Sequence, residues 1–216
     1  FLEPRVPDLS HTMRMVERLA RRFSPSILRW RYDTIVITRE LDRSWHMRNF
    51  AELCRMLAAY SSECIFSFCD YYKKTIKNME AYVPSHEKPQ ERECREIAKE
   101  MALIANDNGI AMTSCSHDFL VSDSIAKARC IDPSWVLKVV DTPDSMKALA
   151  ALRKVPSRKE CGCFASKDIG AYDTCAHGCV YCYANTNPEA GRKNLALISQ
   201  KDACLDPKSA RSEGRS

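Results

Sequence analysis

This chain has no run of apolar residues that approaches the roughly 20 needed to span a membrane. Its first residues, Phe1–Asp8, contain neither the basic segment nor the apolar segment of a secretory signal peptide. There is no internal repeat, and the net charge of +5 comes without a dense stripe of lysine and arginine. We therefore interpret the basic residues as a solvated surface. These absences predict a cytoplasmic protein with neither a membrane nor a nucleic acid as its partner.

Cysteine, in contrast, is abundant, at 12 of 216 residues. A secreted disulfide scaffold would be shorter and would follow a signal peptide, whereas clustered cysteines in the cytoplasm more often bind metal. Cys54, Cys64, Cys69 and Cys94 fall within helix or strand patterns, so we interpret them as packing residues. Cys204, near the end of the sequence, receives no role.

Helical and strand patterns alternate along the first two thirds of the chain. Helices are expected over residues 9–23, 44–60 and 91–106, and strands over residues 27–33, 63–70 and 110–115. This alternation predicts an α/β fold in which the three strands run parallel and are adjacent or nearly so. We assign residues 1–155 to this domain, residues 156–188 to a cysteine-rich loop and residues 189–216 to a disordered tail.

The chemistry of the loop is concentrated in a C-x3-C-x2-C run formed by Cys175, Cys179 and Cys182. Thiolates hold the soft irons of iron–sulfur clusters, and a short loop gathers several thiolates around one small cube. Gly178 allows the backbone to approach such a cluster. Because only three cysteines are present, a [4Fe–4S] cluster here would keep one iron free for an outside ligand, by the logic that gives catalytic zinc its open position.

Zinc is the main alternative to an iron–sulfur cluster as the metal bound by this loop. Cys179 and Cys182 form a C-x2-C half-site that His177, or the pair Cys161 and Cys163, could complete. A dithiol redox pair at Cys179 and Cys182 lacks the strand-then-helix setting that such pairs have. The runner-up function is accordingly a non-catalytic protein whose loop is held together by zinc or by an iron–sulfur cluster.

Four further cysteines form a second candidate group. Cys161 and Cys163 lie upstream of the motif, Cys115 ends the third predicted strand, and Cys130 lies in the following loop. We predict that these four lie close enough to share a second cluster or a zinc ion. The alternative for Cys115 and Cys130 is that they are small buried apolar residues.

The spacing of the motif, with the aromatic Tyr181 before its third cysteine, resembles that of the radical S-adenosylmethionine (SAM) enzymes. In that resemblance the amino and carboxylate groups of SAM chelate the open iron, and reduction cleaves SAM to a 5′-deoxyadenosyl radical. The resemblance therefore implies SAM as a cofactor, an electron donor as a partner and Tyr181 as a residue of the cofactor site. It leaves the substrate unknown.

The chain as a whole resembles a family known as DUF1848, whose function is undefined. The resemblance rests on Arg29–Asp33, Ile65–Asp70, Ser114–Cys115, Cys130–Asp132 and the cysteine segment from Cys161 to Asn185. It implies that the chain is the C-terminal portion of a longer protein, with a partial TIM-barrel-like β/α domain followed by a cluster-binding loop. Radical SAM barrels carry the motif after their first strand, so its position here would suit a circularly permuted strand order.

The first predicted strand carries three charged residues on one side. Alternation places Arg29, Arg31 and Asp33 opposite Trp30 and Tyr32. Charges on a buried face are costly unless they are paired or functional. We expect these three either to bind the SAM carboxylate or a substrate phosphate, or to form an internal ion pair.

Overall fold

The computed structural model describes residues 1–138, 140 and 142–199, and the chain divides into two compact units. The sheet unit comprises Leu9–Cys69 and Ser85–Ser166. The loop unit comprises Phe1–Asp8, Asp70–Pro84 and the described residues from Lys167 on. The region that we assigned to a single domain, residues 1–155, thus contributes two of its segments to the loop unit. Cys204 lies outside the described residues.

A four-stranded parallel sheet is the centre of the sheet unit. Its strands are β1 (Trp30–Ile35), β3 (Glu63–Phe68), β5 (Ala111–Ser114) and β6 (Ile125–Lys127), in that spatial order. All three pairings are parallel, which confirms the predicted arrangement of the first three strands. β6 was not predicted, because three residues are too few to show a periodicity. In the described part of the chain the sheet is open, so a TIM barrel is not shown.

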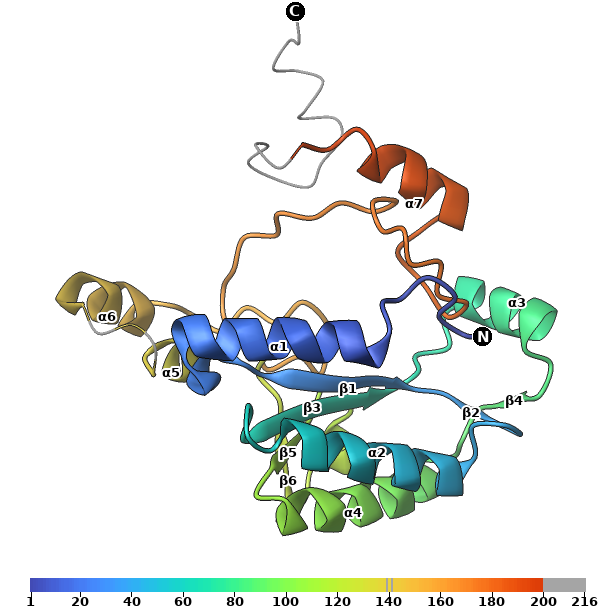
Figure 1. Cartoon of the computed structure of the whole chain (residues 1–216), viewed down its shortest axis with the longest axis horizontal. Coiled ribbons are helices and arrows are strands. Elements are labelled where there is room, and N and C mark those ends of the chain that lie inside the picture. Colours follow the sequence, from blue (N-terminus) through green and yellow to red (C-terminus); the bar gives the residue numbers. More distant parts are fainter. Residues whose placement is uncertain (139, 141, 200–216) are drawn as a thin grey trace, which may run out of the picture. The chain divides into compact units, whose positions relative to one another are not determined.

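Two amphipathic helices, α2 (Arg43–Leu57) and α4 (Glu91–Asp107), pack on one face of this sheet (Figure 1). Asp42 caps α2 by accepting a hydrogen bond of 2.7 Å from the N–H of Trp45. The core between helices and sheet includes Phe50, Phe66 and Met101, all fully buried. Cys54, Cys64 and Cys94 also lie in this core, as their sequence patterns predicted.

The opposite face of the sheet is polar. Because side chains alternate along a strand, the residues of β1 and β3 that do not enter the core include Arg31, Asp33, Glu63 and Ser67. Thr113 of β5 adds a hydroxyl group that donates to Glu63 over 3.1 Å. The sequence pattern of β1 had predicted this segregation of charges, and the same face carries the first group of candidate functional residues.

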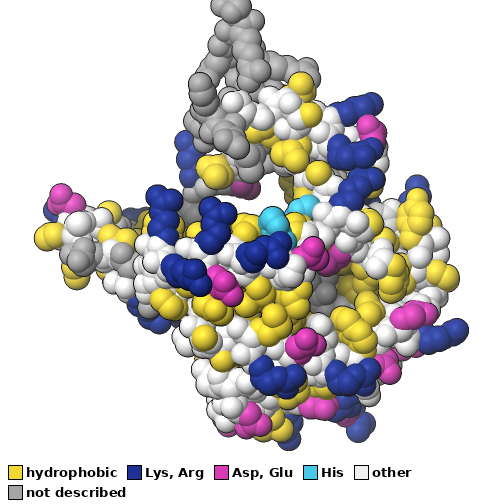
Figure 2. Space-filling view, viewed as in Figure 1, with side chains coloured by type: hydrophobic (Ala, Val, Ile, Leu, Met, Phe, Trp, Pro, Cys, Tyr) yellow, Lys and Arg dark blue, Asp and Glu magenta, His cyan; other side chains and the backbone are white. Residues whose placement is uncertain are grey.

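The remaining elements of the sheet unit are short, apart from α1. They are α1 (Leu9–Phe23), η1 (Pro25–Ile27), β2 (Ile37–Thr38) with its antiparallel partner β4 (His86–Glu87), η2 (Asp118–Leu120), α5 (Pro133–Val136) and α6 (Pro143–Ala150). Helix α1 has no buried residue, and its basic side chains lie on the surface (Figure 2). None of the helices in the described ranges has the length and apolarity of a membrane span.

The loop unit contains two helices, α3 (Lys73–Tyr82) and α7 (Pro188–Leu195). Neither was predicted. Residues 189–199, which we had placed in a disordered tail, include most of α7, while residues 200–216 lie outside the described residues. Asn187 caps α7 by accepting from the N–H of Ala190 over 2.8 Å, and Pro188 occupies its first turn.

Candidate functional site

The cysteine motif lies on an irregular segment of the loop unit. Gly178 has φ +71°, a left-handed conformation that glycine adopts without strain, and it turns the chain just before Cys179. The N–H of Cys182 then donates to the carbonyl of Cys179 over 3.1 Å, closing a tight turn around Val180 and Tyr181. Two of the three motif cysteines are therefore fixed at the two ends of one turn.

Helix α3 and the first residues of the chain hold this turn in place. The buried Thr75 donates its hydroxyl to the carbonyl of Tyr181 over 3.3 Å, and Asn78 donates its amide to the carbonyl of Val180 over 3.2 Å. The N–H of Val180 donates to the carbonyl of Leu2 over 2.9 Å. Side chains of a regular helix thus satisfy carbonyls that have no partner within the turn.

The first cysteine is positioned from the other side of the motif. Asn185, which is 5% exposed, donates its amide to the carbonyl of Cys175 over 2.5 Å. Gly191 of α7 packs against the same carbonyl so closely that a Cβ at this position would lie 2.1 Å from the oxygen. Asn185 and Gly191 are functional candidates that sequence reasoning missed, because neither lies in the C-x3-C-x2-C pattern.

Asp173 joins the two segments that flank the motif cysteines. The carboxylate of Asp173 accepts hydrogen bonds from the N–H and the hydroxyl of Thr186, and these bonds hold the pKa of Asp173 below its usual range. Asn194 of α7 donates to the carbonyl of Asp173 over 2.9 Å. The segments that flank the cysteines are consequently tied to each other and to α7.

The three motif thiols differ in burial. Cys175 is exposed, while Cys179 and Cys182 are partly buried. Burial, with smaller contributions from the charges of Glu3, Cys182 and Cys175, raises the pKa of Cys179 to about 11. Cys179 and Cys182 also line a cavity of about 340 Å³ whose wall is formed by residues of the loop unit. Three thiols on one anchored segment, two of them beside a cavity, fit the type of donor that an iron–sulfur cluster needs.

Tyr181, the aromatic residue of the motif, points its hydroxyl at Glu3, to which it donates a hydrogen bond. Burial raises the pKa of Tyr181, and the hydrogen bond to Glu3 acts in the same direction. The tyrosine therefore holds the N-terminal segment against the motif, and it stays neutral at physiological pH. A contact of Tyr181 with a cofactor remains a prediction.

The second group of candidate residues lies in the sheet unit, where β5 and β6 end. Cys115 follows β5 and Cys130 follows β6, and their sulfur atoms are 3.8 Å apart. Arg31 donates from Nη1 to Cys130 Sγ over 2.9 Å and from Nη2 to Asp33 over 2.5 Å. The hydroxyl of Ser67 donates to the second oxygen of Asp33. Neighbouring strands thus gather two thiols, a cation and a carboxylate at the carboxyl edge of the sheet, where parallel sheets usually carry their sites.

The paired thiols titrate together. The hydrogen bond between them lowers the pKa of Cys115 to about 5 against the opposing effect of burial, and Arg31 contributes to this lowering. The same hydrogen bond and burial raise the pKa of Cys130. The pair consequently loses one proton readily and retains the other, and the positive charge of Arg31 stabilises the resulting anion.

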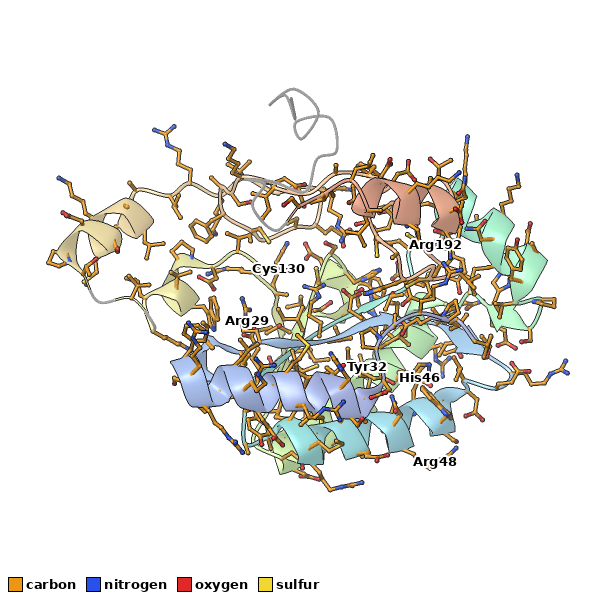
Figure 3. The ribbon with its side chains drawn as sticks, turned by 45° about the horizontal axis from the view of Figure 1, so that its top comes forward. Arg29, Tyr32, His46, Arg48, Cys130 and Arg192 are labelled. Carbon is orange, nitrogen blue, oxygen red and sulfur yellow. The ribbon has the colours of Figure 1, made fainter. Side chains whose placement is uncertain are left out.

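The Arg–Asp ion pair that we had considered as an alternative to a cofactor site is formed by Arg31 and Asp33. Arg29 pairs instead with Glu63. Its guanidinium donates two hydrogen bonds to the carboxylate of Glu63, over 2.7 and 2.8 Å, and a third of 2.7 Å to the carbonyl of Arg129. Its side chain is only 10% exposed. Figure 3 shows Arg29 and Cys130 labelled in the sheet unit. These contacts connect β1 and β3 to the segment that carries Cys130.

Cys163 lies near this group through its backbone neighbours. The N–H of Ile131 donates to Cys163 Sγ over 3.5 Å, and the N–H of Phe164 donates to the carbonyl of Ile131 over 3.1 Å. Although burial opposes it, a hydrogen bond from Ser157 and another from the Cys163 N–H lower the pKa of Cys161 to about 7.

The predicted second metal site needs all four sulfurs of Cys115, Cys130, Cys161 and Cys163. The 3.8 Å between the first two is the edge that a tetrahedral site with bonds of about 2.3 Å would have. Among the described residues, however, no three histidine, cysteine or acidic side chains are grouped so that they could hold one metal ion. The described structure brings two of the four sulfurs together, and a metal shared by all four stays a prediction.

Comparison with known protein families places the chain in a family. The model of a domain family of unknown function, DUF1848, matches residues 1–184, a span that includes all three motif cysteines. Neither the curated proteins nor the solved structures gave a significant match to the chain.

Proposed function

We propose that this chain, a member of the DUF1848 family, is an iron–sulfur protein whose cluster is held by Cys175, Cys179 and Cys182. The observation that carries the proposal is geometric: the three thiols lie on one segment whose backbone is anchored, with Cys179 and Cys182 at the two ends of one turn and the carbonyl of Cys175 held by Asn185. A packing role does not account for them, because none of the three belongs to the buried core of the described residues.

The hydrogen bonds that anchor the loop support a site whose ligands are preorganised for metal binding. Thr75 and Asn78 hold the Cys179–Cys182 turn, and Asn185 holds Cys175. Preorganisation of this kind reduces the conformational entropy that ligand binding would otherwise cost. We infer that these three side chains orient the ligands and do not themselves bind iron.

A cluster and a single metal ion require different spacings of their ligands. Each thiolate of a [4Fe–4S] cube binds a different iron, so its ligands lie further apart than the ligands of one zinc ion. Among the described residues, no three histidine, cysteine or acidic side chains are grouped to hold a single metal ion, so the support for a cluster is the C-x3-C-x2-C spacing of the motif. When bound, the cluster would supply one-electron chemistry, with one iron lacking a cysteine ligand.

The finer proposal is that the site is radical-SAM-like and that SAM occupies the open iron. Its support is the three-cysteine spacing with Tyr181, together with the cavity that Cys179 and Cys182 line. Cavities of about this volume are at the small end of the range for small-molecule sites. The residues of this chain would orient the ligand and exclude water from it. The guanidinium of Arg29 is directed instead to Glu63 and to the backbone carbonyls of Arg129 and Cys130.

The proposal is tested by metal analysis after anaerobic reconstitution with iron and sulfide. We expect about four irons and four sulfides per chain and a broad visible absorption, all lost when Cys175, Cys179 and Cys182 are replaced together by alanine. The matched control replaces Cys54, Cys64 and Cys94 by alanine singly, since these thiols are buried in the core and should leave iron content unchanged. Bound zinc without sulfide would instead favour the structural zinc alternative.

Replacement of Cys161 and Cys163 distinguishes an open cluster from a closed one. If neither residue is a ligand, the double serine variant should retain the iron content and the spectrum of the unmodified chain. Loss of the cluster in this variant would show that a fourth cysteine closes the site, and would count against the radical-SAM-like form of the proposal.

A further inference from the structure

The pair Cys115 and Cys130 is independent of the proposed cluster site. Each residue follows one of two adjacent parallel strands, and the N–H of Ala128 donates to the carbonyl of Ser114 over 2.9 Å, which extends the strand pairing up to the cysteines. The strand register therefore brings both thiols to the same edge of the sheet. Their sulfur atoms touch at 3.8 Å.

We propose that Cys115 and Cys130 form a redox-active dithiol that closes to a disulfide by exchange with a small-molecule disulfide. The sulfurs would have to approach by about 1.8 Å to reach the bond length of about 2.05 Å. Rotation of two side chains can supply such a movement without breaking the strand pairing. No disulfide joins the described cysteines, so the structure corresponds to the reduced pair.

The surroundings of the pair favour a reactive role over packing. Ile65 and Ala128 lie beside the thiols, as a packing role would require. Yet Arg31 also places its guanidinium 2.9 Å from Cys130 Sγ, and Asp33 holds that guanidinium from the other side. A guanidinium next to a sulfur stabilises a thiolate, which is the nucleophile of thiol–disulfide exchange. Cys54 serves as a comparison, because its side chain is fully buried in the core. Among the described contacts, no arginine or lysine donates a hydrogen bond to its sulfur.

The exchange conserves atoms and electrons. The pair shares one proton along its S···S contact, and transfer of this proton to Cys115 leaves Cys130, the more exposed of the two, as the attacking thiolate. Cys130 attacks one sulfur of the small disulfide and releases the other half as a thiolate, which takes up a proton from solvent. Cys115 then attacks Cys130 Sγ in the mixed disulfide, giving up its own proton and releasing the second half as a thiol. The protein loses two electrons, and one small disulfide is reduced to two thiols.

Differential alkylation of the reduced, full-length chain tests the proposal. The chain is incubated with oxidised glutathione under native conditions, quenched with acid, alkylated and digested with trypsin. Cleavage after Lys99, Lys127, Arg129 and Lys138 separates the two cysteines into peptides 100–127 and 130–138, each with one cysteine. We expect these two peptides to be recovered joined by a disulfide, and to separate on reduction.

Variants report on the order of steps and on Arg31. Cys115→Ser should accumulate the glutathione adduct on Cys130, since the second step is removed. Arg31→Met should slow closure by about tenfold through loss of thiolate stabilisation, and Arg31→Lys should largely restore the rate. Cys94→Ser, a buried thiol of α4, is the control that should leave closure unchanged.

The proposal is overturned if peptides 100–127 and 130–138 remain separate and alkylated while other cysteines react. It is also overturned if Cys130 is found joined to Cys163 instead. Both outcomes are read on the unmodified chain, so they do not depend on whether a variant folds.

Discussion

Replacement of Gly191 by alanine should displace the first proposed cluster ligand. The added Cβ would lie 2.1 Å from the carbonyl oxygen of Cys175 and 2.6 Å from Nδ2 of Asn185, whereas real Cβ atoms essentially never approach closer than 3.0 Å. The obstacle is a backbone atom that cannot rotate away. The carbonyl and α7 must therefore separate by about 1 Å, and the bond from Asn185 to Cys175 is strained or lost.

The expected magnitude follows from two opposing effects. Overpacking of this kind costs about 1–3 kcal/mol. Alanine in a helix regains about 0.5–1 kcal/mol relative to glycine. The net destabilisation should be on the order of 1–2 kcal/mol. The effect on metal binding should be larger, because ligand distances tolerate only about 0.2 Å of error.

The assay compares iron content, visible absorption and urea midpoint of Gly191→Ala with those of the unmodified chain. Gly170→Ala is the matched control in the same unit, because a Cβ there would meet only the flexible side-chain oxygen of Asp168, at 3.2 Å. We expect Gly191→Ala to bind much less iron and Gly170→Ala to bind as much as the unmodified chain. Equal iron content and equal midpoints in all three would refute the reasoning.

Two further predictions concern the sheet unit. In urea titrations, Arg29→Met should lower the free energy of unfolding by about 2–4 kcal/mol, because it leaves Glu63 largely buried without its ion-pair partner. The control Arg43→Met removes an exposed ion pair and should cost under about 1 kcal/mol. Similar losses in the two variants would contradict this account. Burial holds the pKa of His46 below its usual 6.5, so the imidazole of the unfolded chain binds a proton at a higher pH than that of the folded chain. The free energy of unfolding should therefore fall as the pH drops below about 6.5, by at most about 1.4 kcal/mol per pH unit. His46→Gln should remove that component from urea midpoints measured between pH 7.5 and 5.5, and an unchanged pH dependence would count against the assignment.

The contacts of His46 show which ring nitrogen carries the proton in the folded chain. His46 Nε2 faces the carbonyl of Val36 at 3.1 Å, and a carbonyl only accepts, so Nε2 carries the proton. Nδ1 then accepts from the hydroxyl of Tyr32 over 2.8 Å (Figure 3). Asn49 donates to the same hydroxyl over 3.2 Å. A proton added to Nδ1 would break the bond from Tyr32 within the protein interior.

Much of the sheet unit was predictable from the sequence. The helices α1, α2 and α4 were found because their apolar residues recur at helical spacing, and β1, β3 and β5 because aromatic and β-branched residues gather there. Alternation along β1 also predicted which side Arg31 and Asp33 share. These features are local, and local patterns are what a single sequence records.

Other features depend on contacts between distant residues and carry no local signal. Thr75 and Asn78 look like ordinary polar residues of a helix until their side chains are seen to hold the turn of the cysteine motif, more than 100 positions away. The contact of Cys115 with Cys130 is likewise set by the pairing of β5 with β6. The sequence suggested that these two cysteines belong together. It could not show that Arg31 donates a hydrogen bond to Cys130.

The central claim is a cluster with three cysteine ligands and one open iron. Mössbauer spectroscopy of the chain reconstituted with ⁵⁷Fe tests it most directly, because each iron site gives its own signal. Addition of SAM should shift the signal of one iron in each cluster of about four and leave the others unchanged. Four equivalent irons that do not respond to SAM would indicate a fourth cysteine ligand, and the absence of any bound cluster signal would contradict the account altogether.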